Sequence, residues 1–316
     1  MRLPQAFDFY AIEVFLLTAE LGGMTQSARH LGITQSAVSQ IIAKLESAVG
    51  VNLFDRTLRP MVLTASGKAL FDHGGKLVIE AKSLIGEIRD GSKLPIETVT
   101  IAMAESVANQ LTAPLVMHLG GRAAHWRIRS GISQIHHSEF LTRKFDMLIT
   151  GSSTLENTPG VEHYNILDEP FILVVPAGYT EEIRTIEQFA GMPFIRYSML
   201  SGMGQRIERQ MARMKVRLPN FMEVDSTFQQ LTSVASGLGW SITTPLCAAG
   251  HMSLMKQLRL APMPRGQFSR TIQLVARLGD LGNLPAATAS FAQRHLHQHS
   301  LPPLLADYPW LKPELG

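Results

Sequence analysis

Apolar residues recur at helical spacing near the start of the chain. A helix is predicted over residues 34–49, where the apolar residues share one face and the opposite face is polar and short. Its apolar residues are Val38, Ile41 or Ile42, Leu45 and Val49. We expect Thr34 to cap this helix, Thr25 to cap a shorter helix before it, and Gly32 to form the turn between them. The apolar stripe expected to cover the pair is Phe9, Ile12, Leu16 and Ala19. The pattern predicts a three-helix domain.

The segment after this helical hairpin reads as two short strands. Leu53–Arg56 and Met61–Thr64 flank a turn through Arg59 and Pro60, which predicts a β-hairpin with arginines at its tip. The helices alone suit any amphipathic hairpin, whereas a basic wing beside them favours DNA binding. The sequence therefore predicts a winged helix-turn-helix domain, rich in α-helix, over residues 1–64.

The polar face of the predicted helix at residues 34–49 carries small and amide side chains. Such side chains let a helix enter a major groove and offer donors and acceptors to base edges. The arginines of the wing would reach phosphates or the neighbouring minor groove. The candidate DNA-binding residues are Gln35, Ser36, Ser39, Gln40, Lys44, Arg56 and Arg59.

A long helix is predicted over residues 65–90, which contain no proline. Its apolar and small residues, at alternating steps of four and three, are Leu70, Gly74, Leu77, Ala81, Leu84 and Ile88. This spacing is typical of a coiled-coil seam and implies a partner helix. The alternative is a helix that lies on its own second domain. The segment 91–95, with glycine, serine and proline, is expected to end the helix as a hinge.

Apolar, β-rich runs alternate with helical stretches after residue 95, which favours open α/β sheets. The runs are Val99–Ala104, Trp126–Arg129, Asp146–Thr150, Phe171–Val175, Phe194–Tyr197, Phe221–Val224, Ser241–Thr243 and Thr271–Arg277. Ligands of such sheets bind beyond the carboxyl ends of the strands, and a cleft between two lobes is the default site. The candidate effector-binding residues at these strand ends are Ser106, Ser133, Gln134, Thr150, Arg196, Ser198 and Thr227.

The chemistry of these positions suggests an anionic or aromatic effector. A guanidinium such as that of Arg196 binds carboxylates through paired hydrogen bonds, unless it forms an ion pair with Glu208 or Asp225. Methionines near the loops suit an apolar or aromatic ligand, or they fill the core. These methionines are Met103, Met147, Met199 and Met203.

Composition limits the protein class. The 316 residues, 45% of them hydrophobic, are enough for two or three domains, and the net charge of +3 means that nucleic acid must be bound by a local basic surface. No apolar run approaches the roughly 20 residues that cross a bilayer, so we expect a cytoplasmic protein without a membrane partner. The single Cys247 excludes a disulfide within one subunit and leaves open a buried small hydrophobe or a sensor thiol.

Catalytic and metal-binding patterns are absent from the sequence. Gly239–Thr243 approaches a nucleophile elbow but lacks its last glycine. His295 and His299 can share a helix face but lack a third ligand, and the adjacent His136 and His137 suit a loop. The sequence therefore predicts no enzyme activity, no metal and no cofactor.

Residues 9–70 resemble the N-terminal domain of LysR-type transcriptional regulators. The resemblance rests on SARHLGITQSAVSQIIAKLESAVGVNLFDRTLRPMVLTASGKAL, residues 27–70, whose pieces occur in the family's order. Ser36 stands where the family usually has proline, which affects base preference rather than DNA binding. More weakly, residues 96–300 resemble the family's effector-binding region, with two lobes similar to periplasmic binding proteins at about 96–165 with 271–300, and about 166–270.

The resemblance implies a sequence-specific transcriptional regulator that binds a double-stranded DNA operator. A small-molecule effector in the cleft, contacted at the positions of Ser106 and Ser133, would shift the relative orientation of the lobes. The long helix would pair two subunits into a homodimer, and dimers would pair into tetramers. Two alternatives remain open here, a small-molecule-binding module with a degenerate DNA-binding domain and a divergent enzyme on the α/β half. The proline-rich tail at residues 301–316 is expected to dock on a neighbouring subunit or to be loose.

Overall fold

The computed structural model of the protein describes residues 4, 6–57, 61–92, 95–131, 133–151, 155, 158, 160–219 and 221–315. The chain divides into two compact units, residues 1–91 with 278–282 and residues 92–277 with 283–316. Each unit has its own apolar core.

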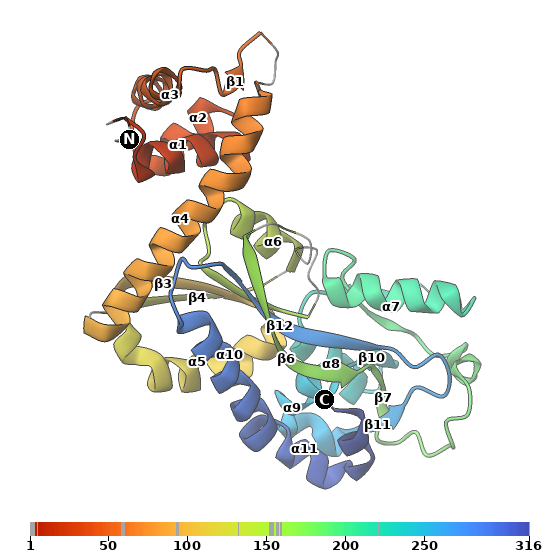
Figure 1. The fold of residues 1–316 in the computed structure, drawn as a ribbon. Coiled ribbons are helices and arrows are strands. Elements are labelled where there is room, and N and C mark those ends of the chain that lie inside the picture. Colours follow the sequence, from red (N-terminus) through yellow and green to blue (C-terminus); the bar gives the residue numbers. More distant parts are fainter. Residues whose placement is uncertain are drawn as a thin grey trace. The chain divides into compact units, whose positions relative to one another are not determined.

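The first unit contains three short helices, a two-stranded hairpin and a long helix (Figure 1). In chain order these are α1 (Phe9–Glu20), α2 (Met24–Leu31), α3 (Gln35–Val49), β1 (Phe54–Asp55), β2 (Val62–Leu63) and α4 (Ala65–Ser92). Their core consists of Ala11, Val14, Phe15, Ala28, Val38, Ile42, Leu45, Leu53 and Phe54. The predicted winged helix-turn-helix fold is confirmed.

The ends of these helices follow local capping chemistry. Thr34 Oγ1 accepts a hydrogen bond of 3.2 Å from the amide of Ala37 at the start of α3, and Gly32 ends α2 at a φ of +67°. The expected cap at Thr25 is wrong, because α2 begins at Met24 with Gly23 at its N-cap, two residues before Thr25. Phe9 is exposed rather than part of the covering stripe, because it lies in the first turn of α1, and the fully buried residues of this helix include Val14 and Phe15.

Helix α4 continues through Gly91 and Ser92, two residues into the segment expected to be a hinge. Its first turns pack in the first unit, where the position of a Cβ on Gly74 would lie 3.0 Å from Ile12 Cγ2. Farther along, Leu77, Leu84 and Ile88 are exposed in the single chain. Among the described side chains of α4, an apolar stripe is therefore exposed from Leu77 onward.

The second unit begins with a five-stranded mixed sheet in the order β4-β3-β5-β12-β6. Its strands are β3 (Ile96–Met103), β4 (Ala123–Ser130), β5 (Met147–Thr150), β6 (Val161–Pro170) and β12 (Ser269–Arg277). Helices α5 (Glu105–Leu119) and α10 (Leu284–His295) cover one face, and α6 (Ser133–Leu141) covers the other (Figure 1). We call this sheet with its three helices the first lobe.

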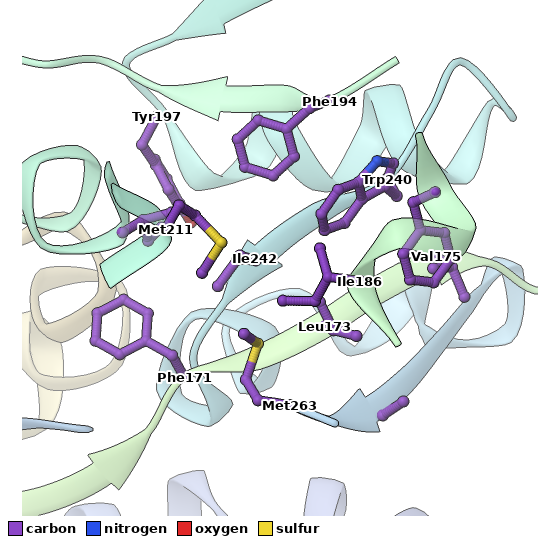
Figure 2. Packing of buried hydrophobic residues seen from close by; sticks show 13 residues of the cluster. Phe171, Leu173, Val175, Ile186, Phe194, Tyr197, Met211, Trp240, Ile242 and Met263 are labelled. Atoms are coloured by element: carbon purple, nitrogen blue, oxygen red, sulfur yellow. The ribbon is translucent and has the colours of Figure 1, made fainter. Parts of the chain in front are cut away.

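A second lobe follows β6. It contains the antiparallel sheet β10-β7-β11 and the parallel pair β8-β9. Its elements are β7 (Ile172–Pro176), β8 (Ile195–Tyr197), α7 (Gly202–Arg213), β9 (Met222–Val224), α8 (Thr227–Ala235), β10 (Ser241–Thr243), α9 (Pro245–Ala249) and β11 (Leu258–Pro262). Figure 2 shows its core, in which Trp240 lies beside Phe194 with a ring-centroid distance of 4.8 Å. Tyr197 and Phe171 belong to the same cluster.

Two antiparallel strands, β6 and β12, carry the chain between the lobes. They pair along their whole length, and Glu169 lies opposite Arg270. Strands β6 and β11 were not predicted from the sequence, because neither contains an uninterrupted apolar run: β6 includes Glu162, Asp168 and Glu169, and β11 includes Arg259.

The C-terminal tail packs on its own chain, which corrects the expectation of a loose or intersubunit segment. Short helical turns run through α11 (Pro302–Asp307) and residues 309–314. Leu301, Leu304 and Leu311 are fully buried, and Tyr308 Oη donates to the carbonyl of Leu258 at 3.4 Å. In the described part of the chain, every helix is too short or too polar to cross a membrane.

Candidate functional site

The polar face of α3 is accessible in the first unit. Gln35, Ser36, Gln40 and Lys44 are exposed and Ser39 is half-buried. The opposite face of the helix is anchored in the core, where Val38, Ile42 and Leu45 are fully buried. A rigid helix that presents small polar side chains outward can insert between the walls of a DNA groove.

Glu46 organises the wing beside this helix. Its buried carboxylate accepts hydrogen bonds from the amides of Leu53 and Phe54 at 2.8 and 3.3 Å, and from Arg56 Nη2 at 2.8 Å. Arg56, predicted to contact phosphates, thus also ties the wing to α3, and its side chain is still 48% exposed. Sequence reasoning missed this role of Glu46. Arg59, the other wing arginine, lies outside the described residues.

A cavity of about 280 Å³ lies between the two lobes of the second unit. Its walls come from the ends of β3, β4 and β5 in the first lobe and from the starts of α7 and α8 in the second. The lining residues are Ala104, Glu105, Ser106, Ser130, Gly131, Gly151, Phe171, Tyr197, Ser201, Gly202, Met203, Arg206, Asp225, Ser226, Thr227, Cys247 and Arg270.

Of the predicted effector-binding residues, Ser106 and Thr227 are brought together at this cavity. Thr150 and Ser198 are buried and are not among the lining residues, although Gly151, next to Thr150, is. The side chains of Ser133 and Gln134 lie outside the described part of the structure.

Arg196 does not line the cavity, which corrects the prediction that it binds an anion there. Its guanidinium forms an ion pair with Glu208 and donates to the carbonyl of Leu218 at 3.1 Å. The ion pair was the alternative that the sequence left open. The physical reason is the alternation of side chains along β8: Tyr197 lines the cavity, so the preceding Arg196 points to the opposite face of the strand, where its guanidinium lies 5.7 Å from the ring centroid of Phe194.

Arg270 is the buried cation at the cavity, and sequence reasoning missed it. Its Nη2 donates to Ser106 Oγ at 3.1 Å in the first lobe and to Thr244 Oγ1 at 3.0 Å in the second. Its Nη2 also lies 2.6 Å from Glu169 Oε1, while Glu169 Oε2 accepts from the amide of Leu246 at 2.8 Å. Burial acts to lower the pKa of Arg270, but the Glu169 carboxylate outweighs it and the pKa is raised. Arg270 on β12 and Glu169 on β6 therefore connect the two lobes at the wall of the cavity.

Hydroxyl groups and one thiol complete the polar wall. Tyr197 Oη lies 3.1 Å from both Thr227 Oγ1 and Thr243 Oγ1, and burial raises the pKa of Tyr197 well above its usual value, so the phenol is neutral. Cys247 Sγ is buried and accepts from Thr227 Oγ1 at 3.7 Å and Arg270 Nη2 at 3.8 Å. With Phe171 and Met203, this wall can bind a small ligand through hydrogen bonds and apolar contact.

The adjacent histidines lie in a helix rather than in a loop. His136 and His137 are buried within α6, and the ring of His136 packs edge-on against Phe145. Burial lowers the pKa of His136. Among the described residues, no three His, Cys, Asp or Glu side chains are grouped so that they could hold a metal ion.

Comparison with known proteins gives two family matches. Residues 9–68 match the profile of the "bacterial regulatory helix-turn-helix protein, lysR family", and residues 92–300 match that of the "LysR substrate binding domain". A transcriptional regulator of Bacillus subtilis, YusT, is 24% identical over 84% of this chain and 88% of its own length. The transcriptional activator protein LysR of Escherichia coli is 24% identical over 78% of this chain and 80% of its own.

Solved structures share the fold. A full-length OxyR variant of Pseudomonas aeruginosa superposes with a TM-score of 0.59 at 17% identity, over 91% of this chain and 95% of its own. DarR of Vibrio fischeri, solved in complex with DNA, gives a TM-score of 0.52 at 21% identity, over 90% of this chain and 98% of its own.

Proposed function

Because the chain belongs to the LysR family of DNA-binding transcriptional regulators with an effector-binding domain, we propose that it binds its operator through the exposed face of α3. The observation that carries this proposal is the accessible polar face of a helix whose other side is locked in the core. Gln35, Ser36, Ser39 and Gln40 contact base edges, and Lys44 and Arg56 contact phosphates. A module with a degenerate DNA-binding domain is not favoured, because the helix-turn-helix match covers all three helices.

The effector site is the cavity between the lobes. Ser106 and Thr227 line it from opposite lobes, and the Ser106 hydroxyl, which accepts from Arg270, keeps its own proton for a ligand. A small molecule that contacts both lobes binds one relative orientation better than others and shifts the population toward it. This shift, passed to the DNA-binding units, changes operator binding or bending. The protein performs no catalysis of its own in this scheme.

Subunits pair through α4 in this proposal. Leu77, Leu84 and Ile88 leave a stripe of apolar surface that a second copy of the helix would cover. A homodimer places two recognition helices on neighbouring half-sites, and two dimers span a longer operator. The protein then works in the cytoplasm, where the DNA is.

Operator binding tests the first proposal. In a gel shift with the DNA upstream of its own gene, the protein should bind a dyad site at least about a thousandfold more tightly than random DNA. Gln40→Ala should reduce the binding free energy for the preferred site by about 1–3 kcal/mol and relax the sequence preference at one base. Lys44→Ala should lower the affinity equally for all DNA sequences and make the affinity less dependent on salt concentration. Equal affinity of the parent protein for operator and random DNA would refute the proposal.

Ser106→Ala tests the effector site. The variant removes the hydroxyl that accepts from Arg270 and faces the cavity, so the effector response should fall several-fold while operator affinity in the absence of effector stays unchanged. The measurement is the change in operator binding when a small-molecule extract of the host cell is added. Ser233→Ala, on the outer face of α8, is the matched control. If Ser106→Ala responds to the effector as the parent protein does, the assignment of Ser106 to the effector site is wrong.

A further inference from the structure

The first turn of α8 forms one end of the cavity. Amides in the first turn of a helix lack acceptors within the helix and carry partial positive charge, so they attract anions. Ser226 is the N-cap, and its Oγ accepts from the amide of Phe228 at 3.2 Å. The amide of Thr227 and the hydroxyl proton of Ser226 then remain as donors.

Glu105 of the first lobe supplies the acceptor for both donors. Its Oε1 accepts from Ser226 Oγ at 2.7 Å and its Oε2 accepts from the Thr227 amide at 2.9 Å. One carboxylate thus takes two hydrogen bonds, one to each oxygen, as a bound carboxylic acid ligand would. Glu105 begins α5, directly after β3, so this contact joins the two lobes across the cavity.

The buried arginine of the cavity, Arg270, also has its hydrogen-bond partners within the chain. Arg270 is fully buried against Glu169, and its remaining donors point to Ser106, Thr244 and Met203. A second carboxylate, Asp225, lines the cavity next to Ser226. At this end of the cavity an acidic ligand would therefore meet the carboxylates of Glu105 and Asp225 where it needs donors. Arg206 lines the cavity from α7, and its Nη1 donates to the carbonyl of Ser269 at 2.7 Å.

We propose that Glu105 is a built-in anion that occupies the N-terminal end of α8, holds the lobes together without a ligand, and closes this end of the cavity to carboxylates. The effector then places a hydrogen-bond donor, such as a hydroxyl or ammonium group, against Glu105. The inference rests on the proposed function only in treating the cavity as the effector site. The experiment uses neither DNA nor effector, so its failure would leave that assignment intact.

Chemical rescue by acetate tests the proposal on the full-length protein. Four proteins are compared in sodium acetate and in sodium chloride of equal concentration: the parent, Glu105→Ala, Glu105→Gln and the control Glu97→Ala, an exposed acid of the same lobe. The readouts are the melting temperature and hydrogen exchange at the Thr227 amide. Glu105→Ala should melt about 2 °C or more below the parent and exchange this amide about tenfold faster.

Acetate should restore both readouts in Glu105→Ala with saturable dependence on concentration, because the small acid enters the vacated place. The parent and Glu97→Ala should show no effect of acetate beyond that of chloride. Glu105→Gln should be intermediate and should not respond, since its amide still fills the space. The proposal is overturned if Glu105→Ala matches the parent in exchange and melting, if acetate fails to rescue it, or if acetate stabilises the parent to the same extent.

Discussion

Replacing Arg270 with methionine is expected to destabilise the second unit by about 3–5 kcal/mol, because it leaves the Glu169 carboxylate buried without a partner charge. Among the described residues, the Leu246 amide would be the remaining hydrogen-bond donor to that carboxylate. The loss is measured by urea unfolding, followed through tryptophan fluorescence, since Trp126, Trp240 and Trp310 all belong to the second unit.

A second variant separates the buried charge from the packing of the arginine. Arg270→Met combined with Glu169→Gln removes the unpaired charge and keeps an acceptor for the Leu246 amide, so it should recover most of the lost stability. If the double variant is as unstable as Arg270→Met alone, the ion pair is not what Arg270 contributes. Both variants should also lose response to effector, since Arg270 joins Ser106 to Thr244.

Gly67→Ala is expected to cost about 3 kcal/mol or more in the first unit and to abolish operator binding. A Cβ at this position would lie 2.0 Å from the carbonyl oxygen of Leu53, far inside contact distance. This carbonyl cannot easily move, because it accepts from the amide of Thr64 at 3.0 Å and so holds the wing to the start of α4. Thermal unfolding and a gel shift measure the two effects.

Gly75→Ala is the matched control in the same helix. Apart from the backbone of α4 itself, no atom of the described residues lies within 4 Å of the position its Cβ would take. Alanine favours helix over glycine, so this variant should gain about 0.5–1 kcal/mol. Equal destabilisation by both substitutions would mean that flexibility of α4, rather than the close approach to Leu53, requires glycine at residue 67.

The sequence predicted those elements whose signal is local. The face and cap of α3 were visible because helical spacing and a threonine at the N-cap lie within one short segment. Most strands were found from apolar runs, and Ser241–Thr243 agrees at both ends with β10. Strand β6 was not predicted because it contains charged residues. One of them, Glu169, pairs with Arg270 of β12 and accepts a hydrogen bond from the Leu246 amide of the second lobe, so it does not contribute to an apolar run.

The sequence predicted Arg196 as the arginine of the cavity, whereas the structure places Arg270 there. Arg196 and Arg270 both lie in β-rich segments, and their sequence surroundings do not say which one faces the other lobe. The pairing of β6 with β12 decides it by placing Arg270 opposite Glu169, a residue 101 positions earlier in the chain. Long-range register of this kind leaves no local pattern. Ser106 and Thr227 were found because both follow the ends of strands.

The packed tail bears on how the protein is handled at the bench. The family match stops at residue 300, which makes that position an inviting place to shorten the chain. Leu301, Leu304 and Leu311 lie just beyond it and are fully covered, with the tail seated against α9, the helix that carries Cys247. A protein truncated after residue 300 would expose the apolar surface that these leucines cover, and we expect it to aggregate. Its loss of effector response would then result from aggregation and not from a change in the effector site.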